Sequence, residues 1–407
     1  MEAGSALAMV DTIGHDNLGD LAGGQLGGLF DAMGSENIES LGGEQVFDMV
    51  GNMSGDDFGQ MGSDSAFGMF ETMGDDQVLD MDGDAMSGMF GAMDNEQLAG
   101  MTGDTTFGAF ETMGTEGFKD MGGDSMAGMF DSMGADHIGS IGGEQIFDMV
   151  EGMTGDNFMT MGSDSAFGMF ETMGDDRIMD MNSDAMSGMF GAMGHEHIAG
   201  MTGDTTFGAF ETMGTEGFKD MGGDSMAGMF DSMGADHIGS IGGEQIFDMV
   251  EGMTGDNFMT MGSDSAFGMF ETMGDDRIGD MEGGTMAGMF DSMGADHIGS
   301  IGGEALFDMV EGMTGDNFMT MGSDSAFGMY ETMGYGNVEG MSGDTMAGMF
   351  DAMGTDHIHE MGSERSFAAF EAMGAESFAG MGGGSVAGML DSMGAGHIGS
   401  IGGEQIF

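Results

Sequence analysis

The chain repeats one pattern of apolar and polar positions every twenty residues. We number the positions of each repeat as steps 1 to 20. In the repeat 121–140, apolar residues occupy steps 1, 6, 9, 10, 13 and 18, and acidic residues occupy steps 4, 11 and 16. The repeats 141–160 and 161–180 keep this phase with conservative changes. A fixed period of this length is typical of proteins whose short structural repeats stack into an array.

Each repeat predicts one longer and one shorter helix. In residues 142–153 the apolar side chains are spaced i, i+3, i+4 and i+7 from Ile146 onward, which places them on one face of a helix. Residues 154–161 carry Phe158 and Met161 three positions apart, which predicts a shorter second helix. We therefore predict an all-α solenoid of about twenty two-helix repeats.

Polar residues at steps 2 and 14 mark the expected helix starts. Thr102 stands at step 2 of its repeat and Thr154 at step 14, and both are residue types that accept hydrogen bonds from free backbone N–H groups. Acids follow two positions later, where the positive end of the helix dipole favours negative charge. Most of the acids are therefore explained by helix chemistry rather than by catalysis.

Glycine at step 8, as at Gly128 and Gly168, predicts that neighbouring backbones approach closely there. In an isolated helix it costs up to about 1 kcal/mol relative to alanine. Short helices are marginal alone, so stability has to come from stacking each repeat on the next. With helices packed about 8–10 Å apart, the array would form a rod or superhelix on the order of 200 Å long.

The pattern extends over the whole sequence. We predict one repeat array over residues 1–407, either a segment of a longer chain or an array continued by neighbouring subunits. Residues 101–178 recur unchanged as 201–278, which indicates duplication of whole repeats. We expect no enzyme, because an active site needs unique residues and these copies offer few.

Composition narrows the classes of function. The 407 residues include 73 acidic and five basic ones, and the formal net charge is -68. Nucleic acid would be repelled, because its binding requires clustered Lys and Arg, and anionic membrane surfaces are disfavoured. The absence of cysteine excludes disulfides, and no apolar run is long enough to predict a membrane span.

The methionines and histidines are the first candidates for metal chemistry. The 60 methionines lie mostly at steps 1, 9 and 13, so we expect core packing rather than a copper(I) site, although thioethers suit that ion. Two local groups suit weak transition-metal binding: His195 and His197 beside Glu196, and His357 and His359 beside Glu360. Six of the nine histidines share step 17: His137, His197, His237, His297, His357 and His397.

Step 17 precedes the buried step 18, so we expect these six histidines to face solvent. A row of imidazoles there would gain charge below about pH 6.5 and relieve repulsion among the acids.

The carboxylates at steps 4, 11 and 16 are the second candidates. Stacking would align them in rows whose repulsion salt screens only partly. Calcium or magnesium would neutralise such rows, because hard cations prefer oxygen ligands. Diffuse divalent binding and plain solvated faces both stay open, and no EF-hand loop is present. The candidate residues are Asp124, Asp131, Asp136, Glu144, Glu151, Asp156, Asp164, Glu171 and Asp176.

Two resemblances bear on fold and location. The segment Gly122-Gly123-Asp124 resembles part of the nonapeptide of calcium-binding β-rolls, and a calcium-binding β-solenoid is therefore the alternative fold, although the nine-residue period is missing. The segment 153–161, MTGDNFMTM, resembles the short helical repeats of very large acidic bacterial surface proteins, written L-T-x-E-Q-φ-x-x-L with φ apolar. This second resemblance covers the whole chain and implies an extracellular or cell-surface location.

These observations favour a structural protein that self-associates as part of an extracellular filament, sheath or adhesin stalk. No cofactor is required, and Ca²⁺ is the ion that the acidic rows suit. The alternative is a cation- or mineral-binding matrix protein in which the acidic rows are the function. A third hypothesis is an intracellular scaffold that binds peptides along a groove.

Overall fold

The computed structural model describes residues 3–14, 18, 21–51, 53–310 and 312–401. Within these ranges the ordered elements are helices and no β-strand is present. The predicted all-helical repeat fold is confirmed, and the alternative β-solenoid is not supported. The chain divides into two compact parts, residues 1–194 and 195–407, which we call the N-terminal and C-terminal halves.

The division falls inside α17 (Ser183–Ala199), at Gly194. The other helices of the N-terminal half are α1 (Ala3–Ile13), α3 (Gly23–Met33), α4 (Ser35–Ile38), α5 (Gly43–Val50), α6 (Gly55–Phe58), α7 (Ser63–Met73), α8 (Asp75–Val78), α9 (Gly83–Ala92), α10 (Asn95–Ala99), α11 (Gly103–Asp120), α12 (Gly123–Ile138), α13 (Gly143–Val150), α14 (Gly155–Met159), α15 (Ser163–Met173) and α16 (Asp175–Ile178).

The C-terminal half continues in the same way after Gly194. Its helices are α18 (Gly203–Asp220), α19 (Gly223–Ile238), α20 (Gly243–Val250), α21 (Gly255–Met259), α22 (Ser263–Met273), α23 (Asp275–Gly279), α24 (Gly283–Ile298), α25 (Gly303–Val310), α26 (Gly315–Met319), α27 (Ser323–Met333), α28 (Tyr335–Val338), α29 (Gly343–Met361), α30 (Ser363–Gly380) and α31 (Gly383–Ile398).

One repeat holds a longer helix from step 3 and a shorter one from step 15, as α15 and α16 show. The longer helix begins one residue later than its sequence pattern suggests, because step 2 is the N-cap. Thr102, for example, accepts a hydrogen bond from the backbone N–H of Thr105. In residues 142–153 the helix was also predicted too long: α13 ends at Val150, and a turn leads to the next helix.

The two helices of a repeat are joined at step 14 in either of two ways. Where step 14 is glycine, as at Gly134 (φ 68°, ψ 168°), the backbone enters the positive-φ region that L side chains rarely adopt, and the short helix follows at once. Where step 14 is Thr, Ser or Asp, as at Thr154 (φ −95°, ψ 167°), that residue is an extended N-cap. The predicted caps at step 14 are therefore correct, and glycine there serves as a hinge between helices.

The core is built from the predicted apolar steps. Met129, Met133 and Ile138 of the repeat 121–140 are buried, and so are Met149 and Phe158 of the next repeat. The prediction that methionine packs in the core is thus confirmed at steps 9 and 13. Larger apolar side chains that stay exposed include Met159, Met259 and Met319, all at step 19.

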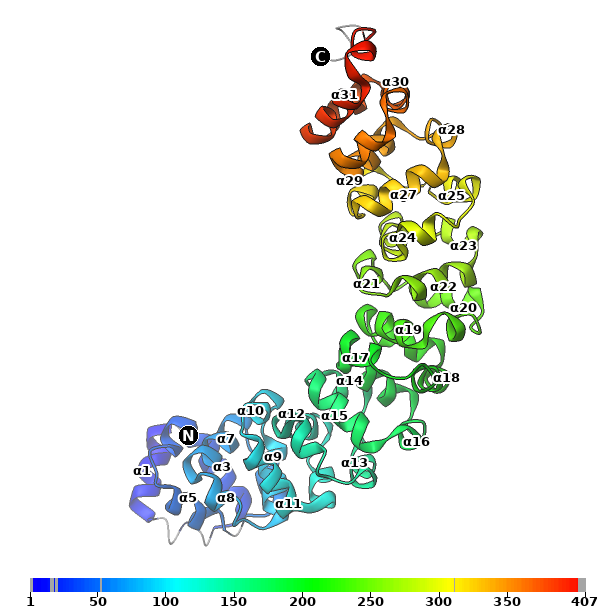
Figure 1. The fold of residues 1–407 in the computed structure, drawn as a ribbon. Helices are drawn as coiled ribbons and strands as arrows, with labels where there is room; N and C mark the ends of the chain where they lie inside the picture. Colours follow the sequence, from blue (N-terminus) through cyan, green and yellow to red (C-terminus); the bar gives the residue numbers. More distant parts are fainter. Residues whose placement is uncertain (1–2, 15–17, 19–20, 52, 311, 402–407) are drawn as a thin grey trace. The chain divides into compact units, whose positions relative to one another are not determined.

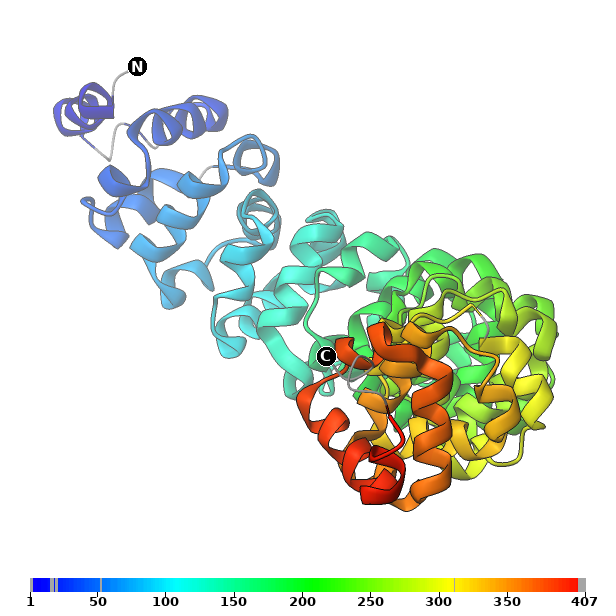
Figure 2. The ribbon, with the colours of Figure 1, turned by 90° about the horizontal axis from the view of Figure 1, so that it is seen from above.

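Stacking connects repeats that are not neighbours in sequence as well as those that are. Figures 1 and 2 show helices of successive repeats side by side within each half. Helix α12 packs against α15, α19 against α22, and α24 against α27, and the long helices of these pairs begin two repeats apart. Each repeat therefore packs against partners on more than one side. This packing supplies the stability that its short helices would lack in isolation.

The glycines at step 8 make the close approach that the sequence predicts. A Cβ atom added to Gly168 would lie 2.9 Å from the Cα of Ala135, at step 15 two repeats earlier. Gly188 meets the backbone of Gly155 in the same way, and Gly348 meets that of Gly315. The short helix of one repeat thus packs directly on the long helix that begins two repeats later.

Candidate functional site: polar contacts that join the repeats

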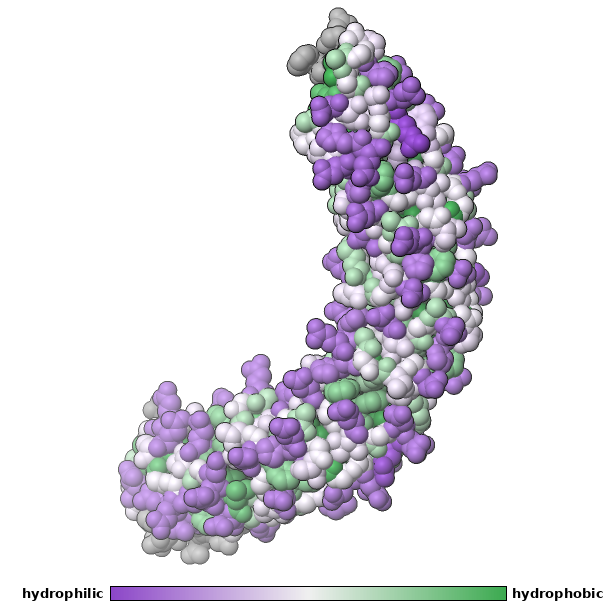
Figure 3. Space-filling view, viewed as in Figure 1, coloured by the Kyte–Doolittle hydropathy of each residue, from purple (hydrophilic) through white to green (hydrophobic). Residues whose placement is uncertain are grey.

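The nine carboxylates predicted to bind divalent cations lie on the surface. Eight are exposed, and Asp131 is half-buried. On the face drawn in Figure 3, hydrophilic side chains are spread along both halves. Among the described residues, no group of three or more His, Asp or Glu side chains is arranged to hold one metal ion. Diffuse cation binding along the rows, which needs no such group, stays a prediction.

At least two of these nine carboxylates bind other repeats. Asp131 accepts a hydrogen bond from the backbone N–H of Gly162 at 2.8 Å, and Asp124 accepts one from the side-chain amide of Asn157 at 2.7 Å. Asp136 and Glu171 line one surface groove of about 630 Å³ together with Gly143. The structure therefore brings some of the predicted residues together across repeats, and gives two of them a structural role.

The Asp124–Asn157 contact belongs to a series that sequence reasoning did not predict. The acid at step 4 of one repeat accepts a hydrogen bond from the side chain at step 17 of the next, always 33 residues later. We call this series the step 4–17 ladder. Its pairs are Asp64–Gln97, Asp104–His137, Asp124–Asn157, Asp204–His237, Asp224–Asn257, Asp264–His297, Asp324–His357 and Asp344–Ser377.

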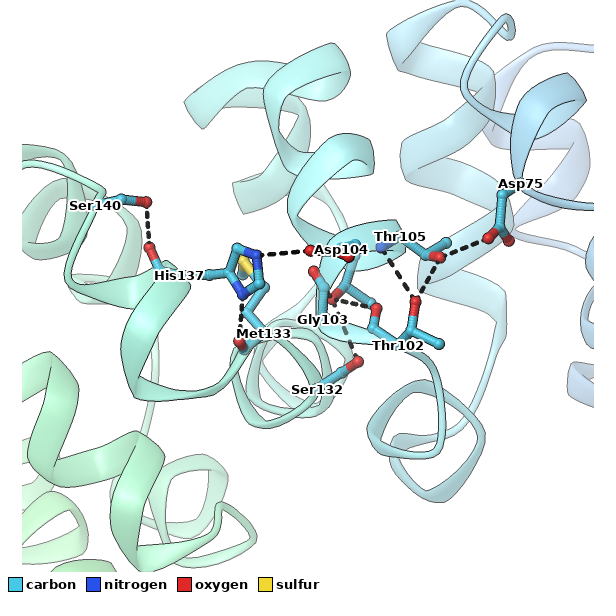
Figure 4. A network of polar contacts seen from close by, with 10 residues as sticks. Asp75, Thr102, Gly103, Asp104, Thr105, Ser132, Met133, His137 and Ser140 are labelled. Atoms are coloured by element: carbon cyan, nitrogen blue, oxygen red, sulfur yellow. Dashed lines mark hydrogen bonds and ion pairs between the residues drawn. The ribbon is translucent and has the colours of Figure 1, made fainter.

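The ladder corrects the prediction that the histidines at step 17 face solvent. All six are half-buried. Figure 4 shows His137 with one ring nitrogen toward Asp104 and the other toward the carbonyl of Met133. The ring also packs on Phe107 with centroids 5.0 Å apart. Step 17 lies beside the long helix of the preceding repeat, and this neighbour covers the ring.

Threonine and serine side chains extend the network around Asp104 (Figure 4). Thr105 donates to Asp75 at 2.8 Å, which joins its repeat to the one that begins at residue 61. Thr106 donates to the hydroxyl of Ser132, which in turn donates to the carbonyl of Met101 at 3.0 Å. These contacts tie three repeats together through short side chains.

A second recurring contact uses the acid at step 11, which accepts from the backbone N–H at step 2 two repeats later. That N–H belongs to the N-cap of a long helix, so the carboxylate stabilises the start of that helix. The pairs are Asp31–Gly62, Asp131–Gly162, Asp231–Gly262, Asp291–Gly322 and Asp351–Gly382.

The surroundings displace the pKa of three side chains among the described residues: Asp57, Tyr330 and Tyr335. Hydrogen bonds from the backbone and hydroxyl of Ser54 lower the pKa of Asp57, as a capping box requires. Burial raises the pKa of Tyr330, whose hydroxyl has no hydrogen-bond partner among the described residues. Burial and a hydrogen bond to Glu339 raise the pKa of Tyr335. All three effects follow from helix capping or packing, and none indicates a catalytic group.

The two histidine groups predicted to bind transition metals are separated into pairs. His195 lies 4.0 Å from Asp231, and His359 lies 3.4 Å from Asp391. His357 contacts Asp324 at 2.9 Å and lies 3.6 Å from Glu360. These three imidazoles, of His195, His357 and His359, therefore each lie near carboxylates of their own or another repeat. Within the described ranges, no helix has the length and apolar content needed to cross a membrane.

Comparison with known proteins gives little further information. No family model matches the chain, and no curated protein matches it. Among solved structures, the chain is similar to an engineered protein with 10% sequence identity and a TM-score of 0.35, over 93% of this chain and 99% of that chain.

Proposed function

We propose that this chain is a structural repeat protein that forms part of an extracellular filament, sheath or stalk. The observation that supports the proposal most is the recurrence of the same contacts between repeats. The step 4–17 ladder joins successive repeats in both halves at the same separation of 33 residues. An array of this kind gains or loses whole repeats without needing a new type of contact, which suits a protein whose role is to span or cover a surface.

The proposed cell-surface location is supported by the resemblance of residues 153–161 to repeats of bacterial surface proteins. The acidic exterior is consistent with it, since a net charge of -68 keeps a long repeat protein soluble and separate from other anionic polymers. Self-association is proposed because stacked repeats present the same surfaces many times, and a weak contact made many times becomes a strong one.

Electron microscopy of the purified chain tests self-association directly. We expect filaments, sheets or tubes once the charge is screened at about 0.5 M salt, where the Debye length falls to a few ångströms. Light scattering on the same samples should show particles whose mass grows with concentration. Single chains at every salt and protein concentration would contradict the proposal.

Deleting residues 101–200 tests the modular character. Residues 201–278 repeat 101–178 without change, so the deletion removes five repeats and keeps the sequence around the new junction. We expect the shortened chain to keep the helical circular dichroism per residue and the assembly of the full chain. As a matched control, deletion of residues 101–190 removes half a repeat besides four whole ones, shifts the register by ten steps, and should fail to fold across the junction.

Titration calorimetry with CaCl₂ separates this proposal from the cation-binding matrix. A structural array should give little heat beyond dilution. Many weak sites, together with stiffening or precipitation of the protein, would instead make cation binding the function of the acidic rows.

A further inference from the structure

The two hydrogen-bond contacts of His237 need one more proton than a neutral imidazole and an ionised carboxylate carry together. Its Nδ1 lies 2.9 Å from the backbone carbonyl of Met233, and its Nε2 lies 3.2 Å from a carboxylate oxygen of Asp204. A carbonyl only accepts hydrogen bonds, and so does an ionised carboxylate. A neutral imidazole has one N–H and satisfies one of these contacts. Both contacts together require one more proton on the His237–Asp204 pair.

Two further histidines of the C-terminal half repeat the contact between Nε2 and the acid at step 4. His297 Nε2 lies 3.0 Å from Asp264, and His357 Nε2 lies 2.9 Å from Asp324. The other nitrogen of His357 lies 3.6 Å from a carboxylate oxygen of Glu360 and has no hydrogen-bond partner in the described part of the chain. That ring therefore lies between two acids of different helices.

Each of these rings is also packed against the preceding repeat. His237 lies on Phe207 with centroids 5.0 Å apart, His297 on Phe267 at 4.4 Å and His357 on Phe327 at 4.5 Å. A protonated imidazole is attracted both by an aromatic face and by a carboxylate. The contact joins two repeats, because Phe and Asp belong to one and His to the next.

The helices packed against α19 carry further charged residues, which are mostly acidic. Asp236 precedes His237 on α19, and Asp204 faces it from α18. The helices packed against α19 also carry Glu211, Glu216 and Lys219 on α18, Asp256 on α21, and Asp264 and Glu271 on α22.

We propose that the His–Asp pairs of the step 4–17 ladder form a proton-dependent lock between successive repeats. When the ring of such a pair takes up a proton, Nε2 donates to the acid from a cation, and at His237 Nδ1 also donates to the carbonyl of Met233. When the proton leaves, the ring loses its charge, and at His237 one nitrogen presents a lone pair to an acceptor. The C-terminal half therefore stiffens as the pH falls through the range in which histidine titrates.

The same ladder contains its own comparison without a titrating group. Asn257 occupies step 17 of the repeat 241–260 and donates from its amide to Asp224 at 2.7 Å. An amide keeps its N–H groups at every pH, so this pair is locked permanently. Asparagine at step 17 is thus a replacement that the fold already accepts.

The test replaces all three histidines by asparagine, as H237N/H297N/H357N. Asp204 is 96% exposed, so water screens each pair and a single site has a small effect. The midpoint of thermal unfolding is measured from pH 8 to pH 6 for the full chain and the variant. We expect the rise in midpoint on acidification to be about 3 °C larger in the unsubstituted chain. Protonation of the many other carboxylates affects both proteins and cancels in the difference.

Two further variants make the result specific. D204N/D264N/D324N keeps the shape of the acceptor and removes its charge, so it should also lose the extra rise. D224N is the matched control, because its partner Asn257 does not titrate, and its pH dependence should equal that of the unsubstituted chain. Equal pH dependence in all four proteins would overturn the proposal.

Nuclear magnetic resonance gives a second readout that does not depend on cooperative unfolding. With ¹⁵N-labelled histidine, His237, His297 and His357 should show protonated Nδ1 and Nε2 together at pH 6. In D204N/D264N/D324N, the same three rings should lose their second N–H at a lower pH than in the unsubstituted chain. Neutral rings with one N–H at pH 6 in the unsubstituted chain would contradict the lock.

Discussion

The neighbouring repeats 221–240 and 241–260 bury the same steps of the pattern but connect their two helices with different backbone conformations. In the first, α19 continues to Met233, turns at Gly234 (φ 66°, ψ 170°) and resumes up to Ile238. In the second, α20 ends at Val250, and a turn leads to the N-cap of α21. Ile238 and Phe258, both at step 18, are nevertheless fully buried.

The difference between the repeats lies in how the short helix is started. Gly234 supplies a backbone conformation that L side chains rarely adopt. Thr254 (φ −98°) supplies an N-cap, whose hydroxyl accepts from the N–H of Asn257 while the Asn257 side chain accepts from the N–H of Thr254. Asn257 uses its amide group as well to reach Asp224. One residue thus caps its own helix and joins two repeats.

The comparison shows that the twenty-residue period fixes where apolar side chains enter the core. The conformation of the linker between the two helices depends instead on the residue at step 14. The two repeats also differ at two other steps. Step 8 is Gly228 in the first repeat, packed on His195, and the exposed Asp248 in the second. Step 17 is His in the first repeat and Asn in the second. The following predictions use these differences, from the largest effect to the smallest.

Truncating the side chain at step 18 should destabilise both repeats strongly. F258A and I238A each remove a fully buried side chain, at a cost of about 3–5 and 2–5 kcal/mol respectively. Urea denaturation followed by circular dichroism gives the free energy of unfolding. If one substitution has almost no effect on the free energy of unfolding, step 18 is not a core position in both repeats, and the comparison of the two repeats is wrong.

At step 8, substitution by alanine should destabilise the first repeat and leave the stability of the second almost unchanged. A Cβ atom on Gly228 would lie 2.9 Å from the Cα of His195, so G228A forces the helices apart and should cost about 1–3 kcal/mol. D248A changes an exposed side chain and should stay within about 0.5 kcal/mol. Denaturation of the two variants side by side measures the difference. Equal effects would mean that close backbone approach is not what step 8 provides.

Step 14 tests the two linkers themselves. G234A places a Cβ in a conformation (φ 66°, ψ 170°) that is essentially restricted to glycine, and should cost about 1–3 kcal/mol. T254G keeps an extended backbone that glycine also adopts and should cost a few tenths of a kcal/mol, whereas T254A should cost about 1 kcal/mol. Thermal and urea unfolding of the three variants give the order. A larger loss for T254G than for G234A would contradict the assignment of a glycine hinge to one repeat and a cap to the other.

Step 11 should give the smallest effect of the four. Asp231 accepts from the backbone N–H of Gly262 at 2.8 Å, and D231A should cost about 1 kcal/mol by leaving this helix start without its carboxylate. Glu251, at the same step of the second repeat, is exposed, and E251A should change stability by less than about 0.5 kcal/mol. Hydrogen exchange at the Gly262 amide measures the local loss, and D231N, which keeps an acceptor oxygen, should recover part of the protection.

Most local features of this fold can be predicted from the sequence. Apolar spacing from Ile246 onward predicts a helix, and Thr254 predicts the start of another, because both depend on residues within a few positions of each other. Burial of methionine at steps 9 and 13 follows from the same periodicity. Where the prediction was wrong, as at the end of α13, a glycine-containing turn after Val150 replaced the last helical turn.

The polar site was predicted only in part. The acids at steps 4 and 11 were recognised as recurring, but their partners at steps 17 and 2 were not, and the histidines at step 17 were expected to face solvent. Asp204 and His237 are 33 residues apart, and nothing in either repeat alone indicates that they meet.

The sequence by itself determined the period, the helices, their caps and the buried face, since each of these depends on contacts within about one repeat. Only the tertiary structure decided which surfaces of different repeats face one another. That outcome depends on the angle and offset at which helices stack, which are set by the sum of many packing contacts rather than by any local motif. The step 4–17 ladder exists because that stacking brings an acid at the start of one long helix beside the short helix of the next repeat.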